Sequence, residues 1–234
     1  MPATQSILAR LIGKIESAPI DSQPTENIYI EELFEHSLYK EMLQRLPPRE
    51  VYDPIVHSDA HLPDGRVTRG ILDLTDESLG RFPAENRDFW QNLNKVFASD
   101  TLQKCILSKF RITMRERFGD TLPEMTSVAV FYKDYPGYFI RPHQDVDWKV
   151  STFQMYLPAD ESQIHLGTSF HLKKGEGFDL HKTNAFKPNS GYSFARTENS
   201  WHSVSQIGAN ESERNTLALT IYLKGREYRS GAAS

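Results

Sequence analysis

Two short segments of the sequence carry side chains that could bind one metal ion. His143 and Asp145 stand two positions apart, and His202 follows much later in the chain. Two imidazoles and one carboxylate, supplied as an H-x-D pair and one distant histidine, form the facial ligand set that suits non-haem Fe(II) and leaves coordination positions open. Arg214 comes shortly after His202, and its planar guanidinium could pair with a carboxylate. Together these residues suggest an iron oxygenase that uses a dicarboxylate co-substrate.

The H-x-D pair alone is weak evidence, because a chain of 234 residues often contains one by chance. His57 and His61 have the spacing that binds zinc on a helix, but the prolines and the glycine around them favour a loop, and no H-E-x-x-H is present. Surface or packing roles are expected for all the remaining histidines, which are His36, His57, His61, His165, His171 and His181.

The proposed ligands must be positioned by strands. Residues i and i+2 of a strand point to the same face, so His143 and Asp145 would project together if their segment is extended. Pro142 favours this conformation, because it fixes its own backbone and keeps Arg141 out of the helical region. His202 must come from a different strand, and the strands predicted in between are enough to go around a barrel and return.

The first half of the chain is predicted to be mainly helical. Ser99 or Asp100 would cap the last of its helices, and Gly119 would end it. Residues 51–70 contain prolines and glycines and are predicted to be irregular. Helical spacing of apolar residues is found in four segments, 6–17, 37–46, 86–98 and 101–118.

Short β-branched or aromatic runs dominate after Pro123 and predict strands. Helices first and strands later indicate an α+β chain whose helices pack outside a β-sandwich or barrel. We expect one domain over residues 1–234, with mainly helical support in 1–120 and the strand core with the metal site in 121–226. The predicted strands are 128–132, 151–157, 169–172, 192–195 and 216–223, with an earlier candidate at 28–30.

Composition excludes several classes of protein. Hydrophobic residues make up 38% and charged residues 25% of the chain, which disfavours disordered and membrane classes. A net charge of −4 gives no bulk attraction for nucleic acid. Cys105 is the only cysteine, which excludes an intramolecular disulfide and a thiolate metal site. Because no signal segment or membrane span is recognisable, a cytoplasmic protein is expected, without nucleic-acid or membrane partners and with its oligomeric state open.

The strand-rich half resembles a known family in several stretches. They are residues 132–145 (YKDYPGYFIRPHQD), 151–158 (STFQMYLP), 188–194 (PNSGYSF) and 201–204 (WHSV). They resemble the Fe(II)/2-oxoglutarate-dependent dioxygenases, in the style of the prolyl-hydroxylase-like branch. The resemblance covers about residues 126–224 and implies a double-stranded β-helix (jelly-roll) core with N-terminal supporting helices. The interval from His202 to Arg214 is slightly longer than is usual in that branch.

The resemblance also implies a set of cofactors and contacts. Fe(II), 2-oxoglutarate and O2 would take part, with ascorbate as an auxiliary reductant, and oxidative decarboxylation would yield succinate, CO2 and a hydroxylated C–H position. Arg214 would pair with the distal carboxylate of 2-oxoglutarate. Asp145 occupies a position that a halide would need, so halogenation is disfavoured. The metal ligands would be His143, Asp145 and His202, and Tyr132 and Tyr156 match positions that contact the co-substrate in similar enzymes. Thr216 lies two residues after Arg214 and could add a hydroxyl from the same face of an extended segment, and Gln154 would share a face with Tyr156.

The sequence says less about the prime substrate, for which a small polar metabolite is expected: an amino acid, a sugar or a natural-product intermediate. Asp147 and Trp148 are candidates for the pocket mouth, although solvated or packing roles are plain alternatives. An anionic or polar group could be anchored by one of three arginines, Arg69, Arg141 or Arg196. Two other functions stay open, a hydroxylase of a protein or peptide side chain and a cupin-like metal-binding protein without 2-oxoglutarate chemistry. Cupins usually show H-x-H with a later Glu and His.

Overall fold

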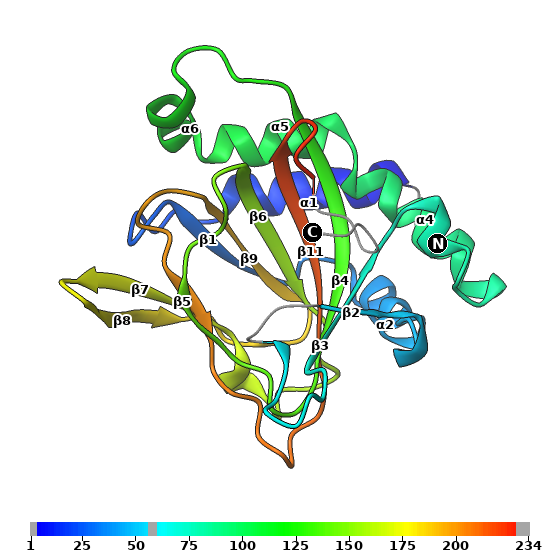
Figure 1. The fold of residues 1–234 in the computed structure, drawn as a ribbon. Helices are drawn as coiled ribbons and strands as arrows, with labels where there is room; N and C mark the ends of the chain where they lie inside the picture. Colours follow the sequence, from blue (N-terminus) through cyan, green and yellow to red (C-terminus); the bar gives the residue numbers. More distant parts are fainter. Residues whose placement is uncertain (1–3, 56–59, 228–234) are drawn as a thin grey trace.

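Two antiparallel sheets form the centre of the protein (Figure 1). The structure is a computed structural model that describes residues 4–55 and 60–227. Within these residues, the larger sheet has the strand order β1-β9-β6-β11-β4-β3-β2 and the smaller sheet has the order β5-β10-β7-β8. The larger sheet contains β1 (Asn27–Glu31), β2 (Asp53–Pro54), β3 (Arg69–Asp73), β4 (Met125–Asp134), β6 (Lys149–Tyr156), β9 (Ser190–Ala195) and β11 (Arg214–Leu223). The smaller sheet contains β5 (Ile140–His143), β7 (Thr168–Lys174), β8 (Gly177–Thr183) and β10 (His202–Val204).

From β4 onward the chain winds back and forth between the two sheets. Strands β4, β6, β9 and β11 lie in the larger sheet, and the strands between them lie in the smaller one. This winding is that of a jelly roll and confirms the predicted double-stranded β-helix core. It places β5 beside β10 and β4 beside β11, although each pair is far apart in the sequence.

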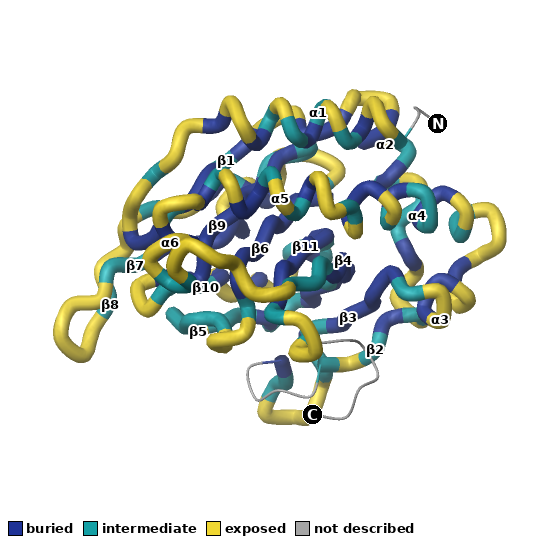
Figure 2. Tube along the Cα trace, turned by 90° about the horizontal axis from the view of Figure 1, so that it is seen from above, coloured by how far each residue is buried: buried dark blue, intermediate teal, exposed yellow. Residues whose placement is uncertain are grey.

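Helices cover one face of the larger sheet, as Figures 1 and 2 show for α1 (Thr4–Ser17), α4 (Ala84–Phe97) and α5 (Asp100–Lys109). In α1, Ile7, Leu11 and Ile15 are buried at four-residue spacing, so one face of the helix joins the core. In the two described ranges, no helix is both long enough and apolar enough to cross a membrane. The other helices are α2 (His36–Gln44), α3 (Asp76–Leu79) and α6 (Arg111–Phe118), with 3-10 turns at Arg49–Val51 and Ile164–Leu166.

The segment predicted as one helix at 101–118 is two helices. Ser99 caps the first of them, since its hydroxyl accepts from the backbone N–H of Leu102 at 3.3 Å. The chain breaks at the fully buried Phe110, and the carboxylate of Glu26 then accepts from the N–H of Thr113 in the first turn of α6. The carboxylate of Glu26 thus satisfies a backbone N–H that has no partner within α6. Because Glu26 is far from Thr113 in the sequence, the spacing of apolar residues in 101–118 does not show the break.

The N-terminal half supplies strands as well as helices. β1 pairs with β9 at one edge of the larger sheet, and β3 pairs with β4 towards the other. Residues 51–70 were predicted to be irregular, yet β2 and the start of β3 fall there. The apolar run of β3 is too short to give a periodic signal, and its pairing with the long β4 stabilises it.

Trp90 of α4 joins the helical layer to the larger sheet. Its ring stands edge-on to Phe131 of β4, with 4.7 Å between ring centroids, and both side chains are fully buried.

Phe131→Ala should lower the free energy of unfolding by about 3–5 kcal/mol, because the lost ring leaves a cavity. Chemical denaturation measures this change. The control is Ile112→Ala on the exposed side of α6, for which about 0.5 kcal/mol or less is expected; an equally small loss for Phe131→Ala would contradict this packing.

Candidate metal centre

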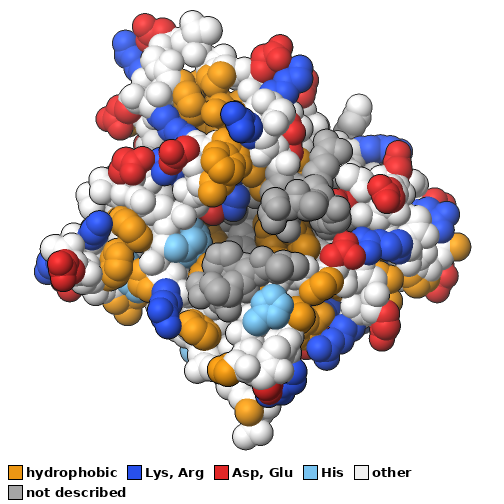
Figure 3. All heavy atoms as spheres, in the orientation of Figure 1, with side chains coloured by type: hydrophobic (Ala, Val, Ile, Leu, Met, Phe, Trp, Pro, Cys, Tyr) orange, Lys and Arg blue, Asp and Glu red, His pale blue; other side chains and the backbone are white. Residues whose placement is uncertain are grey.

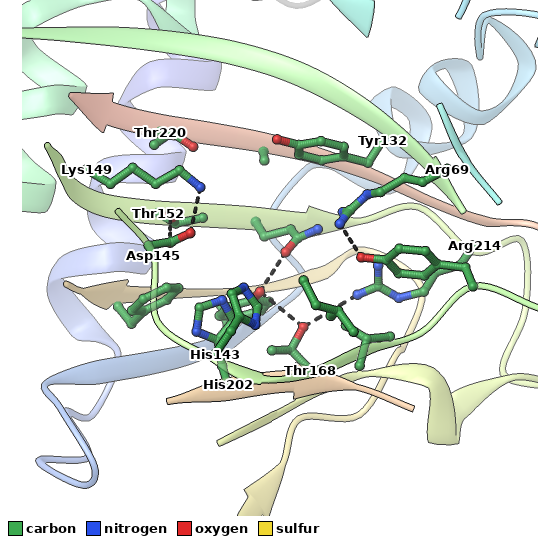
Figure 4. Close-up of a pocket in the computed structure, with 17 residues that line it drawn as sticks. Arg69, Tyr132, His143, Asp145, Lys149, Thr152, Thr168, His202, Arg214 and Thr220 are labelled. Atoms are coloured by element: carbon green, nitrogen blue, oxygen red, sulfur yellow. Dashed lines mark hydrogen bonds and ion pairs between the residues drawn. The ribbon is translucent and has the colours of Figure 1, made fainter. Parts of the chain in front are cut away.

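The two sheets bring His143, Asp145 and His202 together. His143 ends β5 and stands directly opposite His202, the first residue of β10, with 4.2 Å between the ring centroids. Asp145 follows two residues after β5, and one ligand atom from each of the three side chains lies within 4.8 Å of the others. Figure 4 shows the three side chains converging on one pocket. Within the described part of the chain, they form the one such cluster of three or more potential ligands.

Hydrogen bonds to the backbone orient both imidazoles. Nδ1 of His143 lies 3.0 Å from the carbonyl oxygen of Arg141, and Nδ1 of His202 lies 2.9 Å from that of Ser200. A carbonyl oxygen can only accept, so each Nδ1 carries the proton and each Nε2 keeps its lone pair. This is the arrangement that neighbouring groups impose on histidine ligands in metalloproteins.

The three side chains are held in the protonation states that bind a cation. Burial and the nearby His202 lower the pKa of His143 to about 3, and burial also lowers the pKa of His202. Burial alone would raise the pKa of Asp145, but the charge of Lys149 and the two histidines hold it well below the ordinary value. Two neutral imidazoles and one carboxylate are the donor set that fits Fe(II).

Two neighbours hold the carboxylate of Asp145. Lys149 Nζ donates to Oδ1 at 2.6 Å, and the hydroxyl of Thr152 lies 3.4 Å from Oδ2. The sequence analysis did not single out either residue. Lys149 stands four positions after Asp145, and the turn between them brings the two side chains together. Neither a helical nor a strand pattern in the sequence predicts this contact.

The pocket around the metal cluster encloses a cavity of about 90 Å³. Arg214, fully buried at the start of β11, lines the end away from Lys149 (Figure 4). Its Nε donates to the carbonyl oxygen of Leu166 at 2.8 Å, and its Nη1 donates to the carboxylate of Asp134 at 2.8 Å. The sequence predicted Arg214 as the anchoring arginine. The structure adds its pairing with the buried carboxylate of Asp134, which no local pattern reveals.

Of the other predicted co-substrate contacts, two line the pocket and two do not. Tyr132 and Gln154 line it. Thr216 lies behind Gln154, whose side-chain amide donates to its hydroxyl at 2.8 Å. The hydroxyl of Tyr156 accepts from the backbone N–H of Thr168 at 2.9 Å, and Tyr156 does not line the cavity.

The predicted substrate contacts also divide. Arg69 lines the pocket, whereas Asp147, Trp148, Arg141 and Arg196 do not. Asp147, Trp148 and Arg141 are exposed on the segment around the metal cluster.

Arg196 is buried and ties the Asp145 segment to the end of β9. Its Nε donates to the backbone oxygen of Asp145 at 3.2 Å, and its Nη groups pair with the carboxylates of Asp147 and Glu198. Because these contacts fix the backbone that carries a proposed ligand, Arg196→Met should weaken Mn(II) binding about 10–100-fold without removing a ligand. Titration followed by electron paramagnetic resonance measures the affinity. Arg141→Met is the exposed control, and equal affinities for the two variants would contradict this positioning role.

The competing histidines lie elsewhere. His57 is outside the described residues, and His61 forms an isolated β-bridge with Val67. Three others contact residues that are not part of the cluster: His165 pairs with Glu211, His181 with Asp21, and His171 lies 2.7 Å from the hydroxyl of Ser203.

Comparisons with known proteins give matches at the level of structure. No family model matches the sequence, and no curated protein matches it. A prolyl-4-hydroxylase from Pseudomonas putida is 19% identical with a TM-score of 0.55, over 92% of this chain and 98% of that one. A Trichoplax adhaerens prolyl hydroxylase, solved with a peptide fragment of the hypoxia inducible factor oxygen degradation domain, is 14% identical with a TM-score of 0.52, over 94% and 90%.

A third match is SnoN, a non-haem alpha-ketoglutarate-dependent epimerase from nogalamycin biosynthesis. It is 10% identical with a TM-score of 0.55, over 98% of this chain and 92% of that one. By their descriptions, two of these proteins are prolyl hydroxylases and the third is an alpha-ketoglutarate-dependent epimerase. The chain therefore shares the fold of these three enzymes over nearly its whole length.

Proposed function

We propose that this protein is an Fe(II)- and 2-oxoglutarate-dependent oxygenase that hydroxylates an unactivated C–H bond of a small polar metabolite. The observation that carries the proposal is the convergence of His143, Asp145 and His202 in one pocket that also contains the buried guanidinium of Arg214. Bound Fe(II) would supply open coordination positions for the 2-oxo acid and for O2. The overall reaction converts R–H, 2-oxoglutarate and O2 to R–OH, succinate and CO2, with one oxygen atom entering each organic product.

The protein's own residues would bind and orient the reactants. His143 and His202 would hold the metal through Nε2, and Asp145 would add one carboxylate oxygen, which Lys149 and Thr152 keep in place. Arg214 would pair with the distal carboxylate of 2-oxoglutarate and so fix the orientation of this molecule in the pocket.

Pocket size and surface charge support a small substrate. The cavity of about 90 Å³ is smaller than the roughly 300–1,000 Å³ of typical small-molecule sites, so only a small group can enter it. On the face in Figure 3, acidic and basic side chains are interspersed rather than gathered into a basic area of the kind that nucleic acid would need. The prolyl hydroxylases of similar fold make a peptide side chain the second candidate substrate.

The test is a substrate screen with Fe(II), 2-oxoglutarate and 18O2, read by succinate release and by product mass. Amino acids, sugars, short proline-containing peptides and chloride are included, with Asp145→Ala as the inactive control. A metabolite product heavier by one labelled oxygen atom is expected. Turnover confined to peptides would contradict the substrate class, a chlorinated product would contradict the reaction, and absence of 2-oxoglutarate-dependent succinate under all conditions would contradict the function.

A further inference from the structure

Three charged side chains form a row across three neighbouring strands at the end of the pocket away from Lys149. Asp134 of β4 stands directly opposite Arg69 of β3 on one side and Arg214 of β11 on the other. Directly paired residues of adjacent strands project to the same face, so both guanidiniums meet the same carboxylate. Arg69 Nε lies 2.9 Å from Oδ1 of Asp134, and Arg214 Nη1 lies 2.8 Å from Oδ2.

The charges of this row do not balance. Two guanidiniums are always protonated, and they share one carboxylate. Asp134 and Arg214 are fully buried and Arg69 is 16% exposed. Asp145 is the one carboxylate among the described residues that line the pocket, and it pairs with Lys149 instead. A buried excess of one positive charge is costly unless an anion compensates it, so this end of the pocket is suited to one further carboxylate.

Arg69 and Asp134 each have a buried polar atom without a hydrogen-bond partner among the described residues. Arg69 Nε and Asp134 Oδ1 are at ion-pair distance but lack hydrogen-bond alignment, and both are buried without another partner among the described residues. The guanidinium of Arg69 is nonetheless held in place, 4.1 Å from the ring centre of Tyr132 and 4.7 Å from that of Tyr138, and it donates to the hydroxyl of Tyr138. A fixed, partly unsatisfied guanidinium is preorganised for an anionic ligand.

We propose that Arg69 is a second anchor for the distal carboxylate of 2-oxoglutarate, with Asp134 as the shared counter-charge that sets the separation of the two guanidiniums. The carboxylate of Asp134 already spans Arg69 and Arg214, so a ligand carboxylate of the same size can bridge them from the cavity side. Figure 4 shows Arg69 and Arg214 at the same end of the pocket. This inference rests on the proposed function and assigns to the co-substrate a residue of β3, outside the jelly-roll strands. It replaces the expectation that Arg69 anchors the prime substrate.

The test compares two ligands that differ at the distal carboxylate. Titration calorimetry on Mn(II)-loaded protein gives dissociation constants for 2-oxoglutarate and for 2-oxobutanoate, which keeps the 2-oxo acid and lacks the second carboxylate. In Arg69→Met, the preference for 2-oxoglutarate should fall about 10–100-fold, the range for hydrogen bonds to a charged group. General damage to the pocket would weaken both ligands and leave their ratio unchanged.

Two further variants complete the experiment. Arg69→Lys keeps the charge but loses the planar fork, so an intermediate preference is expected, and it carries the test if Arg69→Met does not fold. Arg66→Met, on an exposed arginine paired with Asp64, should keep the wild-type preference. A wild-type preference retained in both Arg69 variants would overturn the role of Arg69 alone. A wild type that binds both ligands equally would overturn the proposed function as well.

Discussion

Alanine at His143, Asp145 or His202 is expected to abolish activity and to reduce metal affinity by more than 100-fold. Each of these side chains supplies one of the three proposed ligand atoms, which lie within 4.8 Å of one another. Loss of a group that merely orients a ligand costs about 10–100-fold in affinity, so loss of a ligand should cost more.

The three alanine variants should stay folded, because His143 and Asp145 are only partly buried and none of the three belongs to the hydrophobic clusters of the core. Metal analysis after dialysis against Fe(II) or Mn(II) gives the occupancy per chain, and circular dichroism checks the fold. His171→Ala is the matched control, since this histidine lies on β7 of the same sheet and bonds Ser203 rather than the cluster. A folded variant that keeps one tightly bound metal per chain would rule out its residue as a ligand.

Replacing Arg214 should selectively weaken 2-oxoglutarate binding. Removing one partner of a buried charge pair costs about 2–5 kcal/mol, so the dissociation constant for 2-oxoglutarate should rise at least roughly 30-fold in Arg214→Met. Metal affinity should hardly change, because Arg214 contacts Asp134, Leu166 and Thr168 rather than the metal cluster.

The structure adds a consequence for stability that the sequence did not suggest. Truncating Arg214 removes a buried partner of Asp134, a change that typically costs about 3–5 kcal/mol when the remaining charge has no partner. Arg69 remains beside Asp134, so the loss in Arg214→Met should fall below that range. Denaturation and calorimetry measure the two effects separately. The exposed Lys224→Met serves as control, and an Arg214→Met protein with wild-type affinity for 2-oxoglutarate would leave Arg69 as the anchor.

The sequence predicted the parts of this protein that depend on local pattern. Strands β4, β6, β9 and β11 were anticipated from β-branched and aromatic runs, and α1 and α4 from helical spacing. The H-x-D pair and the distant histidine were recognised because residue types and spacing alone carry that signal. The jelly roll followed from the order of the elements and the family resemblance.

Features that depend on pairing between distant strands were not predictable. Asp134 acquires its importance because β3 and β11 place Arg69 and Arg214 on either side of it, and nothing near Asp134 in the sequence fixes that register. Thr216 was expected to face the co-substrate from its position relative to Arg214. In the structure the side chain of Gln154 on the neighbouring strand lines the cavity and bonds the Thr216 hydroxyl.

The linked binding of Fe(II) and 2-oxoglutarate tests the central claim most directly. Under oxygen-free conditions, 2-oxoglutarate is titrated calorimetrically into wild-type protein that is either metal-free or loaded with one Fe(II) per chain. The facial cluster of His143, Asp145 and His202 leaves positions for a chelating 2-oxo acid, so one 2-oxoglutarate per chain should bind tightly to the iron-loaded protein and far more weakly to the metal-free one. Equal binding with and without Fe(II) would contradict the account.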